Sequence, residues 1–177
     1  MKYLLRQEKV SDHAEVESLI KEAFADVELS DHREHDLVTR LRKSPSFVPA
    51  LSIVAESEGK IVGHILFTRI KIEHEDESHE ALALAPVSVL PDHQGRGIGA
   101  ALIKEGHKVA QRLGFKASVL LGHETYYPRF GYERASTFGI SLPFEVPDEN
   151  VMAFALQEGA LEHMRGTVEY DAAFFAG

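Results

Sequence analysis

A glycine-rich stretch between an apolar strand and a helix constrains this chain more than any other segment. Residues 82–90 are apolar at both odd and even positions, which is typical of a strand covered on both faces of a sheet. Gly95, Gly97 and Gly99 follow it, and a helix is predicted over residues 98–113. Without side chains here, successive backbone N–H groups can surround an anion, and the helix N-terminus adds unpaired donors. The stretch therefore predicts a pyrophosphate-binding loop, rather than a purely structural glycine turn.

The rest of the chain alternates between strand and helix patterns. Strands are expected at residues 3–6, 51–56, 61–72, 82–90 and 117–121, with one or two after Tyr132 and another at 151–156; helices are expected at about 12–24, 37–43 and 98–113, with one or two helical turns at 126–130. Hairpins beside a strand–helix–strand unit predict a mixed sheet flanked by helices, which is an α/β (α+β) fold.

Three local features carry specific structural expectations. Asp12 and Glu15 have the spacing of a capping box at the start of the first helix. Gly59 marks a hairpin turn, whereas residues 73–80 are too charged for a core and predict a loop at the surface. On the long helix, the apolar face is expected to comprise Ile98, Leu102, Val109 and Leu113.

Composition excludes several classes of function. The 177 residues fit one domain, and 28 acidic against 19 basic residues give a net charge of −9, which argues against nucleic-acid or anionic-membrane binding. The absence of cysteine excludes disulfides, cysteine-ligated metals and a cysteine nucleophile. Because no targeting segment and no apolar run of about 18 residues is visible, we expect a cytoplasmic protein without a membrane span.

The charge is unevenly distributed along the chain. Residues 92–116 contain five Lys and Arg against two acids, a net charge of +3, which leaves −12 on the remainder. The basic excess coincides with the predicted phosphate loop and its helix. We therefore expect a basic strip for an anionic ligand and acidic surroundings that favour a cationic partner.

A dinucleotide could also occupy such a loop. The pattern Gly95-x-Gly97-x-x-Ala100 fits the loose fingerprint of dinucleotide-binding folds, and Glu124 lies near the expected ribose-binding position. However, about 80 residues precede the strand before the loop and only about 50 follow Glu124, too few for the remainder of a doubly wound sheet. The context therefore argues against this alternative.

Two motifs resemble a known family. Val87, Val89, Pro91 and the pattern Gln94-x-x-Gly97-x-Gly99 resemble the acyl-CoA-binding core of the GNAT superfamily of N-acetyltransferases, and Tyr127-x-x-x-Gly131-Tyr132 resembles a second motif of that family at the right distance. The likeness spans about residues 3–135 and includes the patterns Leu113-Gly114-Phe115 and Val54–Gly63. The tail is similar to that of a largely uncharacterised bacterial branch.

The resemblance implies a GNAT fold in which the fourth and fifth strands run parallel and diverge. Residues 1–135 would form the acetyltransferase core, and the strands of 136–177 would complete the same domain. Acetyl-CoA would be the co-substrate, with no metal. Its pantetheine would pair with the backbone of Val87 and Val89, and its pyrophosphate would bind to the loop formed by Gln94, Gly95, Arg96, Gly97, Ile98 and Gly99. Pro86, inside a central strand, supports a local break beside Val87.

The resemblance also implies the catalytic roles. Tyr127 would protonate the departing thiolate, with Tyr126 as the neighbouring alternative; a buried structural aromatic is the competing interpretation. The glutamate that many family members carry near the fourth strand is absent from residues 81–85. His123 is therefore a candidate base, although it could instead orient the tyrosines or the substrate. A water chain past Ser88, with no dedicated base, is the third possibility.

The acceptor is expected to be a primary amine on a small molecule or a peptide. The acidic segment 28–36 occupies the family's acceptor-side loop, and it is either a recognition element or simply a solvated loop. His74 and His79 lie among acids, but their spacing fits no standard metal site. Residues 136–177 could support a homodimer. The alternative function is a CoA-binding sensor that has the same fold and no turnover.

Overall fold

The computed structural model describes residues 2–28 and 30–175. Within them, the strands are β1 (Leu4–Gln7), β2 (Phe47–Ser57), β3 (Lys60–His74), β4 (Glu77–Val89), β5 (Ala117–Leu121), β6 (Glu133–Arg134), β7 (Ile140–Ser141), β8 (Val151–Ala155) and β9 (Gly166–Glu169). The α-helices are α1 (His13–Phe24), α2 (Glu34–Arg42) and α3 (Ile98–Arg112). Short 3-10 turns lie at Val10–Asp12, Pro91–His93, Tyr127–Phe130, Ala135–Phe138, Asp148–Asn150, Ala160–His163 and Ala172–Phe174.

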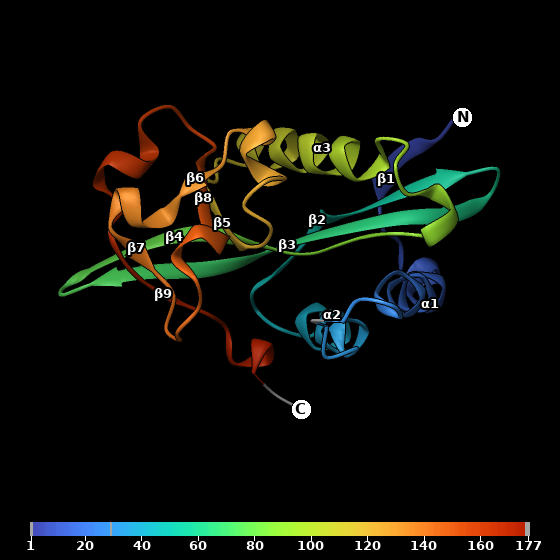
Figure 1. The fold of residues 1–177 in the computed structure, drawn as a ribbon, viewed down its shortest axis with the longest axis horizontal. Helices are drawn as coiled ribbons and strands as arrows, with labels where there is room; N and C mark the ends of the chain where they lie inside the picture. The colour runs from blue at the N-terminus through green and yellow to red at the C-terminus, as the bar shows by residue number, and fades with distance from the viewer. Residues whose placement is uncertain (1, 29, 176–177) are drawn as a thin grey trace.

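The strands form one mixed sheet with helices on both faces. The main path runs β1-β2-β3-β4-β5-β8-β6, and β9 joins β3 to β7. The pairs β4–β5 and β7–β9 are parallel, and the other pairs are antiparallel. Figure 1 shows α3 on one face of the sheet and α1 with α2 on the other. The predicted α/β architecture is therefore confirmed, and no helix among the described residues is long and apolar enough to span a membrane.

The prediction from local sequence was right for the β2–β3 hairpin and wrong for the β3–β4 hairpin. Glu58 and Gly59 both have positive φ, at 51° and 77°, as the tight turn predicted between β2 and β3 requires. The loop predicted at 73–80 is wrong, because β3 extends to His74 and β4 begins at Glu77. The backbone ladder continues there through the pairs Lys71↔Glu80 and Glu73↔Ser78. Charged side chains can stand on the solvent side of such a ladder without a core beneath them.

The capping box predicted at the start of α1 is also wrong. Asp12 makes no side-chain cap bond to α1; its carboxylate accepts hydrogen bonds from the Arg6 side chain at 2.7 Å and from the Lys9 backbone at 2.7 Å. Glu15 instead accepts a 2.7 Å bond from the backbone N–H of Ile61. Asp12 therefore caps the preceding 3-10 turn through Lys9 and ties it to β1 through Arg6, whereas Glu15 ties α1 to the distant strand β3.

Helix α3 packs against β3 through a position that has no side chain, Gly106. The buried stripe runs through Ile98, Leu102, Gly106 and Ala110, so Leu113, at the end of the helix, falls off it and is 50% exposed. The predicted burial of Leu113 is thus wrong. A Cβ at Gly106 would overlap the ring of fully buried Phe67. The missing side chain lets the helix approach the sheet closely.

The substitution Gly106→Ala is expected to destabilise the protein despite its better helix propensity. Overpacking against Phe67 costs about 1–3 kcal/mol, partly offset by about 1 kcal/mol of propensity. The melting temperature should fall by a few degrees. In a double-mutant cycle, Phe67→Leu should restore part of the loss, because it removes the overlapping atoms. Strict additivity of the two changes would show that Gly106 has another role.

A network of buried polar side chains lies beneath the sheet, on the α1–α2 side. Glu8 pairs with Arg42 of α2 at 2.6 Å and accepts a 2.9 Å bond from Ser52. Ser52 in turn lies 2.9 Å from Nε2 of His64, which is 0% exposed. Burial lowers the pKa of His64 to about 4, so this histidine is neutral at pH 7.

Candidate active site

The predicted phosphate loop joins β4 to α3 through a 3-10 turn at Pro91–His93. Gly95 and Gly97 have φ values of 77° and 82°, and a Cβ on either would meet open space. Their backbone conformation, rather than crowding, is therefore what favours glycine. Gln94 closes the end of the strand, since its Nε2 donates a 3.1 Å hydrogen bond to the carbonyl of Val89. Gly97 is the N-cap of α3, where unpaired N–H groups face outward.

One cavity brings most of the predicted site residues together. It has a volume of about 620 Å³, within the usual range for small-molecule sites. It is lined by Val87, Val89, His93, Gln94, Gly95, Gly97, Ile98, Gly99, Ala100, His123, Tyr126, Tyr127 and Arg129. The wall thus combines the end of a strand, the glycine loop with its helix N-terminus, and two tyrosines. Such a wall suits an elongated ligand with a phosphate group.

The sheet opens at this cavity. β4 pairs with β5 only at Leu82↔Ser118 and Ala83↔Val119 within the described residues. Just beyond, the β3–β4 ladder shifts by one residue, from Phe67↔Leu84 to Ile65↔Val87, so β4 bulges at Ala85–Pro86. The break expected beside Pro86 is therefore present, and Val87 and Val89 have no β5 partner in the ladder. Their strand edge is open toward the gap.

Tyr127 is held in a ring cluster at the far side of the cavity. Its ring packs edge-on against Tyr126 at 5.1 Å and against Tyr132 at 5.9 Å, measured between ring centroids. A Cβ at Gly122 would lie 2.5 Å from its Cε2, so glycine after β5 leaves room for this ring. Burial, and then the neighbouring Tyr126, raise the pKa of Tyr127 to about 12. The phenol is therefore protonated at neutral pH.

Three lining residues were not assigned a binding role from the sequence. Arg129 lies over the ring of Tyr126, with its Cζ 4.6 Å from the centroid, and its Nε donates a 2.9 Å bond to the Tyr126 carbonyl. His93 carries a buried Nδ1 without a hydrogen-bond partner among the described residues. Ala100 completes the first turn of α3. His93 lies inside the glycine motif, whereas Arg129 reaches the cavity from a segment 30 residues away in the chain.

Other predicted residues occupy different positions. Ser88 is 2% exposed and points away from the cavity, because it is in register with His64 on the α1–α2 side of the sheet. Its hydroxyl has no hydrogen-bond partner among the described residues. Arg96 is exposed in the glycine loop and is not among the residues that line the cavity. His123, by contrast, lines it from just after β5.

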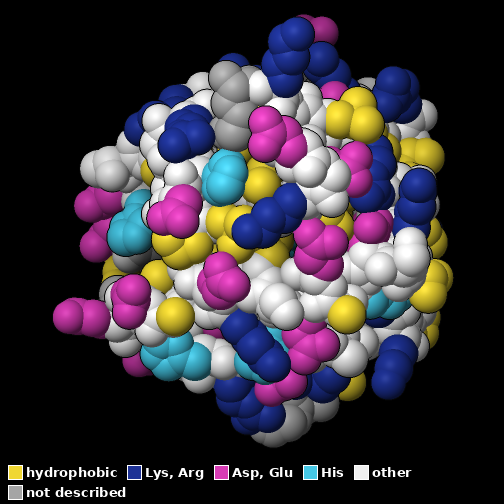
Figure 2. Space-filling model, turned by 90° about the vertical axis from the view of Figure 1, so that its right-hand side faces the viewer, with side chains coloured by type: hydrophobic (Ala, Val, Ile, Leu, Met, Phe, Trp, Pro, Cys, Tyr) yellow, Lys and Arg dark blue, Asp and Glu magenta, His cyan; other side chains and the backbone are white. Residues whose placement is uncertain are grey.

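The surface around the loop carries both signs of charge. The basic residues of the 92–116 segment are all exposed. Figure 2 shows the side of the molecule on which the glycine loop lies in Figure 1, and Lys and Arg alternate there with Asp and Glu. Among the described residues on this face the charges are therefore mixed, and no continuous basic strip is visible. Within the described residues, no group of three His, Asp or Glu side chains is arranged to hold a metal ion.

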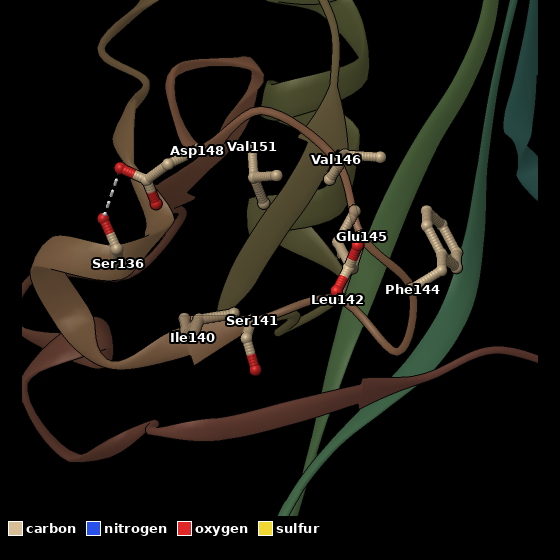
Figure 3. Close-up of a pocket in the computed structure, with 9 residues that line it drawn as sticks. All are labelled: Ser136, Ile140, Ser141, Leu142, Phe144, Glu145, Val146, Asp148 and Val151. Atoms are coloured by element: carbon tan, nitrogen blue, oxygen red, sulfur yellow. Dashed lines mark hydrogen bonds between the residues drawn. The ribbon is translucent and has the colours of Figure 1, made fainter.

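A separate cavity of about 550 Å³ lies beside the segment from Leu142 to Val146, away from the predicted site residues. Ser136 bonds to Asp148 at 3.1 Å on one side of it. In Figure 3, the ring of Phe144 lies at the opposite end, beside the ribbon of the long hairpin. Because none of the predicted site residues lines this cavity, it is not the candidate active site.

The family model for an acetyltransferase (GNAT) domain matches residues 5–135. A protein of Escherichia coli K12 named uncharacterized N-acetyltransferase YjhQ is 42% identical over 126 residues, which cover 71% of this chain and 70% of that protein. The E. coli K12 protein named uncharacterized N-acetyltransferase YhbS is 26% identical over 171 residues, covering 97% of this chain and 98% of that protein.

Two crystal structures are similar over nearly the whole chain. The structure of E. coli YhbS in complex with CoA has a TM-score of 0.89 at 25% identity and covers 99% of this chain and 93% of that one. A GNAT family acetyltransferase from Brucella melitensis, in complex with acetyl-CoA, has a TM-score of 0.80 at 32% identity and covers 98% of both chains. The similarity therefore extends through the C-terminal strands, beyond the region matched by the family model.

Proposed function

Because this chain belongs to the GNAT family of acetyltransferases, we propose that it transfers the acetyl group of acetyl-CoA directly to a primary amine. The observation that carries the proposal is the single cavity in which the glycine loop, the unpaired end of β4 and Tyr127 meet. The CoA and acetyl-CoA complexes of the two similar structures support the same ligand.

The geometry suggests how acetyl-CoA would lie. The pyrophosphate would accept hydrogen bonds from backbone N–H groups of the loop and the first turn of α3, with Arg129 and Arg96 as cations nearby. The pantetheine would run along the open edge of Val87 and Val89, whose backbone groups have no β5 partner. The thioester would then lie in the gap between β4 and β5, close to Tyr127.

The transfer makes three chemical demands. The amine must be neutral to attack the thioester carbon, because an alkylammonium, whose pKa is about 10.4, has no free electron pair. As the C–N bond forms, the carbonyl oxygen gains negative charge, which a backbone N–H of β4 would stabilise. As the C–S bond breaks, the thiolate takes up a proton, and the amide nitrogen loses one.

Tyr127 is the proposed proton donor to the sulfur. Its phenol is protonated because burial raises its pKa to about 12, and it lines the cavity where the thioester would lie. His123 is proposed to receive the amine proton or to orient the amine, since it lines the same wall. Ser88 faces the opposite side of β4, so any role in a water chain would be on the α1–α2 side of the sheet.

The alternative is a CoA sensor without turnover, and one experiment separates the two functions. Purified protein is incubated with acetyl-CoA and a panel of primary amines, and free CoA thiol is measured; thermal shift with CoA and with NAD is measured in parallel. We expect amine-dependent CoA release with intersecting initial-velocity lines, and stabilisation by CoA but not by NAD. With ligand at about 100 times its Kd, this stabilisation is about 2.7 kcal/mol.

Each other outcome contradicts a specific part of the proposal. Stabilisation by CoA without release on any amine would favour the sensor. An acetylated protein, detected by mass spectrometry in the absence of amine, would contradict direct transfer. Preferential stabilisation by NAD would contradict the cofactor assignment.

A further inference from the structure

Besides the candidate active site, a second cavity opens at the gap between β4 and β5, and it has a volume of about 290 Å³. On β4 its wall ends at Ala85, two residues before Val87 of the CoA cavity; on β5 it ends at Leu121, two residues before His123. The two cavities are therefore lined by adjacent segments of the chain on both diverging strands, although no described residue lines both. The lining residues are Leu37, Ala83, Leu84, Ala85, Val119, Leu120, Leu121, Phe144, Tyr170, Phe174 and Phe175.

The two cavities open on opposite faces of the sheet. Leu37 belongs to α2, and Phe174 belongs to a C-terminal turn that contacts α2, whereas the glycine loop belongs to the side of α3. Figure 1 shows the C-terminal segment ending beside α2, across the sheet from α3. A molecule in the second cavity would thus reach the thioester from the side opposite to CoA.

The outer wall is aromatic and is assembled from two distant segments. The rings of Phe144 and Tyr170 are nearly parallel, at 16° and 6.1 Å between centroids. Phe175 stands edge-on to both, at 5.8 Å from Tyr170 and 6.5 Å from Phe144, and Phe174 lies 4.7 Å from Tyr170. Phe144 and Phe175 remain 41% and 63% exposed, so the aromatic cluster forms an exposed apolar patch.

The C-terminal part of this wall is held in place by hydrogen bonds. Asp171 accepts a 2.8 Å bond from the backbone of Ala173 and a 3.0 Å bond from the hydroxyl of Ser46. Arg40 of α2 donates a 2.9 Å bond to the carbonyl of Ala173. Phe174 and Phe175 are therefore positioned by the body of the domain.

We propose that this pocket binds the acceptor, and that the acceptor is a primary amine on a flat apolar body, such as an arylalkylamine. The inference rests on the proposed acetyltransferase function and adds the substrate class. Every lining side chain is apolar or aromatic, and none of the described acids of segment 28–36 lines the pocket. A body with several charges would lose its hydration there without gaining an ion pair.

Size and charge agree with this assignment. About 290 Å³ corresponds to roughly ten water molecules at about 30 Å³ each, enough for one ring and a short chain. Burial raises the pKa of Tyr170 to about 12, so its phenol is uncharged. An ammonium group entering from this side would be partly desolvated, which lowers its pKa and favours the neutral nucleophile. The pocket thereby reduces the demand on a dedicated base.

Two measurements test the proposal. The first compares kcat/KM for phenethylamine and for putrescine; we expect a preference of about 10- to 100-fold for phenethylamine, the range for burying one aromatic side chain. The second uses two conjugates in which the CoA sulfur carries N-acetylphenethylamine or N-acetylputrescine through the acetyl carbon. Calorimetry should show at least about tenfold tighter binding of the aryl conjugate.

Single substitutions in the aromatic wall test whether these rings cause the preference for phenethylamine. Phe144→Ala and Phe175→Ala, both at partly exposed positions, should each raise the KM for phenethylamine about tenfold and leave the KM for acetyl-CoA unchanged. Leu113→Ala, which removes an exposed apolar side chain that lines neither cavity, is the matched control and should behave as wild type.

The outcomes separate this inference from the proposed function. If putrescine is acetylated as well as or better than phenethylamine, or the two conjugates bind equally, the substrate class is wrong while acetyl transfer stands. If neither amine is acetylated but the aryl conjugate binds more tightly and Phe175→Ala removes its advantage, the aryl pocket stands and the proposed function fails.

Discussion

Replacing Tyr127 by phenylalanine is expected to lower kcat about 100-fold and to leave the KM for acetyl-CoA nearly unchanged. The substitution removes the hydroxyl that would donate a proton to the departing thiolate. It keeps the ring that packs against Tyr126, Tyr132 and the space left by Gly122, so the fold should be retained. Steady-state kinetics with acetyl-CoA and an amine, together with melting curves, measure both effects.

The matched control is Tyr126→Phe. The Tyr126 hydroxyl points toward the start of α3, lying 3.4 Å from where a Cβ of Gly99 would be, and its loss should change kcat only a few-fold. The reverse pattern, with a large loss for Tyr126→Phe and none for Tyr127→Phe, would move the proton donor to Tyr126. Because the pKa of Tyr127 is raised to about 12, ionisation of this phenol should not limit kcat below about pH 10.

The second large effect is a loss of stability in mild acid. Burial lowers the pKa of both His64 and His107 to about 4, below the ordinary value of 6.5. Between these values the unfolded chain binds more protons than the folded one, so stability falls as pH decreases from about 6.5 to about 4. From pH 7 to pH 5, each histidine should reduce the free energy of unfolding by about 2 kcal/mol.

Urea unfolding at pH 7 and pH 5 measures this loss. Each histidine uses Nε2 in a 2.9 Å hydrogen bond, His64 with Ser52 and His107 with Tyr132, and glutamine can preserve these bonds without titrating. The loss in free energy of unfolding between pH 7 and pH 5 should therefore be roughly halved by His107→Gln. Adding His64→Gln should nearly abolish it. His163→Gln, at an exposed position, should leave the difference unchanged. An undiminished difference in the double variant would place the acid sensitivity elsewhere.

A further loss is expected in stronger acid. The Arg6 hydrogen bond holds the pKa of Asp12 at about 2, below its usual 3.8. The carboxylate form therefore stabilises the fold above about pH 4, and this stabilisation disappears as pH falls through 2. The two acid-sensitive windows are separate, because the histidines have titrated before Asp12 does.

The proposed cofactor end of the site could be predicted because residues close together in the sequence build it. Gly95 and Gly97 adopt the left-handed conformations that their residue type favours, and Pro86 coincides with the bulge that separates β4 from β5. A loop of a few residues followed by a helix has its geometry determined locally. The capping box failed because Glu15 bonds to the distant strand β3. The loop at residues 73–80 failed because its charged residues continue a hairpin ladder through local pairs such as Glu73↔Ser78.

The proposed acceptor pocket depends on tertiary structure alone. The sequence contained Phe144, Tyr170 and Phe175 with no spacing that relates them, and only the packing of the C-terminal turn on α2 brings their rings together. The same holds for Arg129 at the cofactor cavity and for the burial of His64. The sequence by itself predicted a phosphate loop, because its glycines set the backbone conformation of a short segment, and the resemblance of its motifs identified the family and the cofactor class. The shape and polarity of the second pocket depend on side chains from α2, β4, β5 and the C-terminal segment, which meet only when the sheet is assembled.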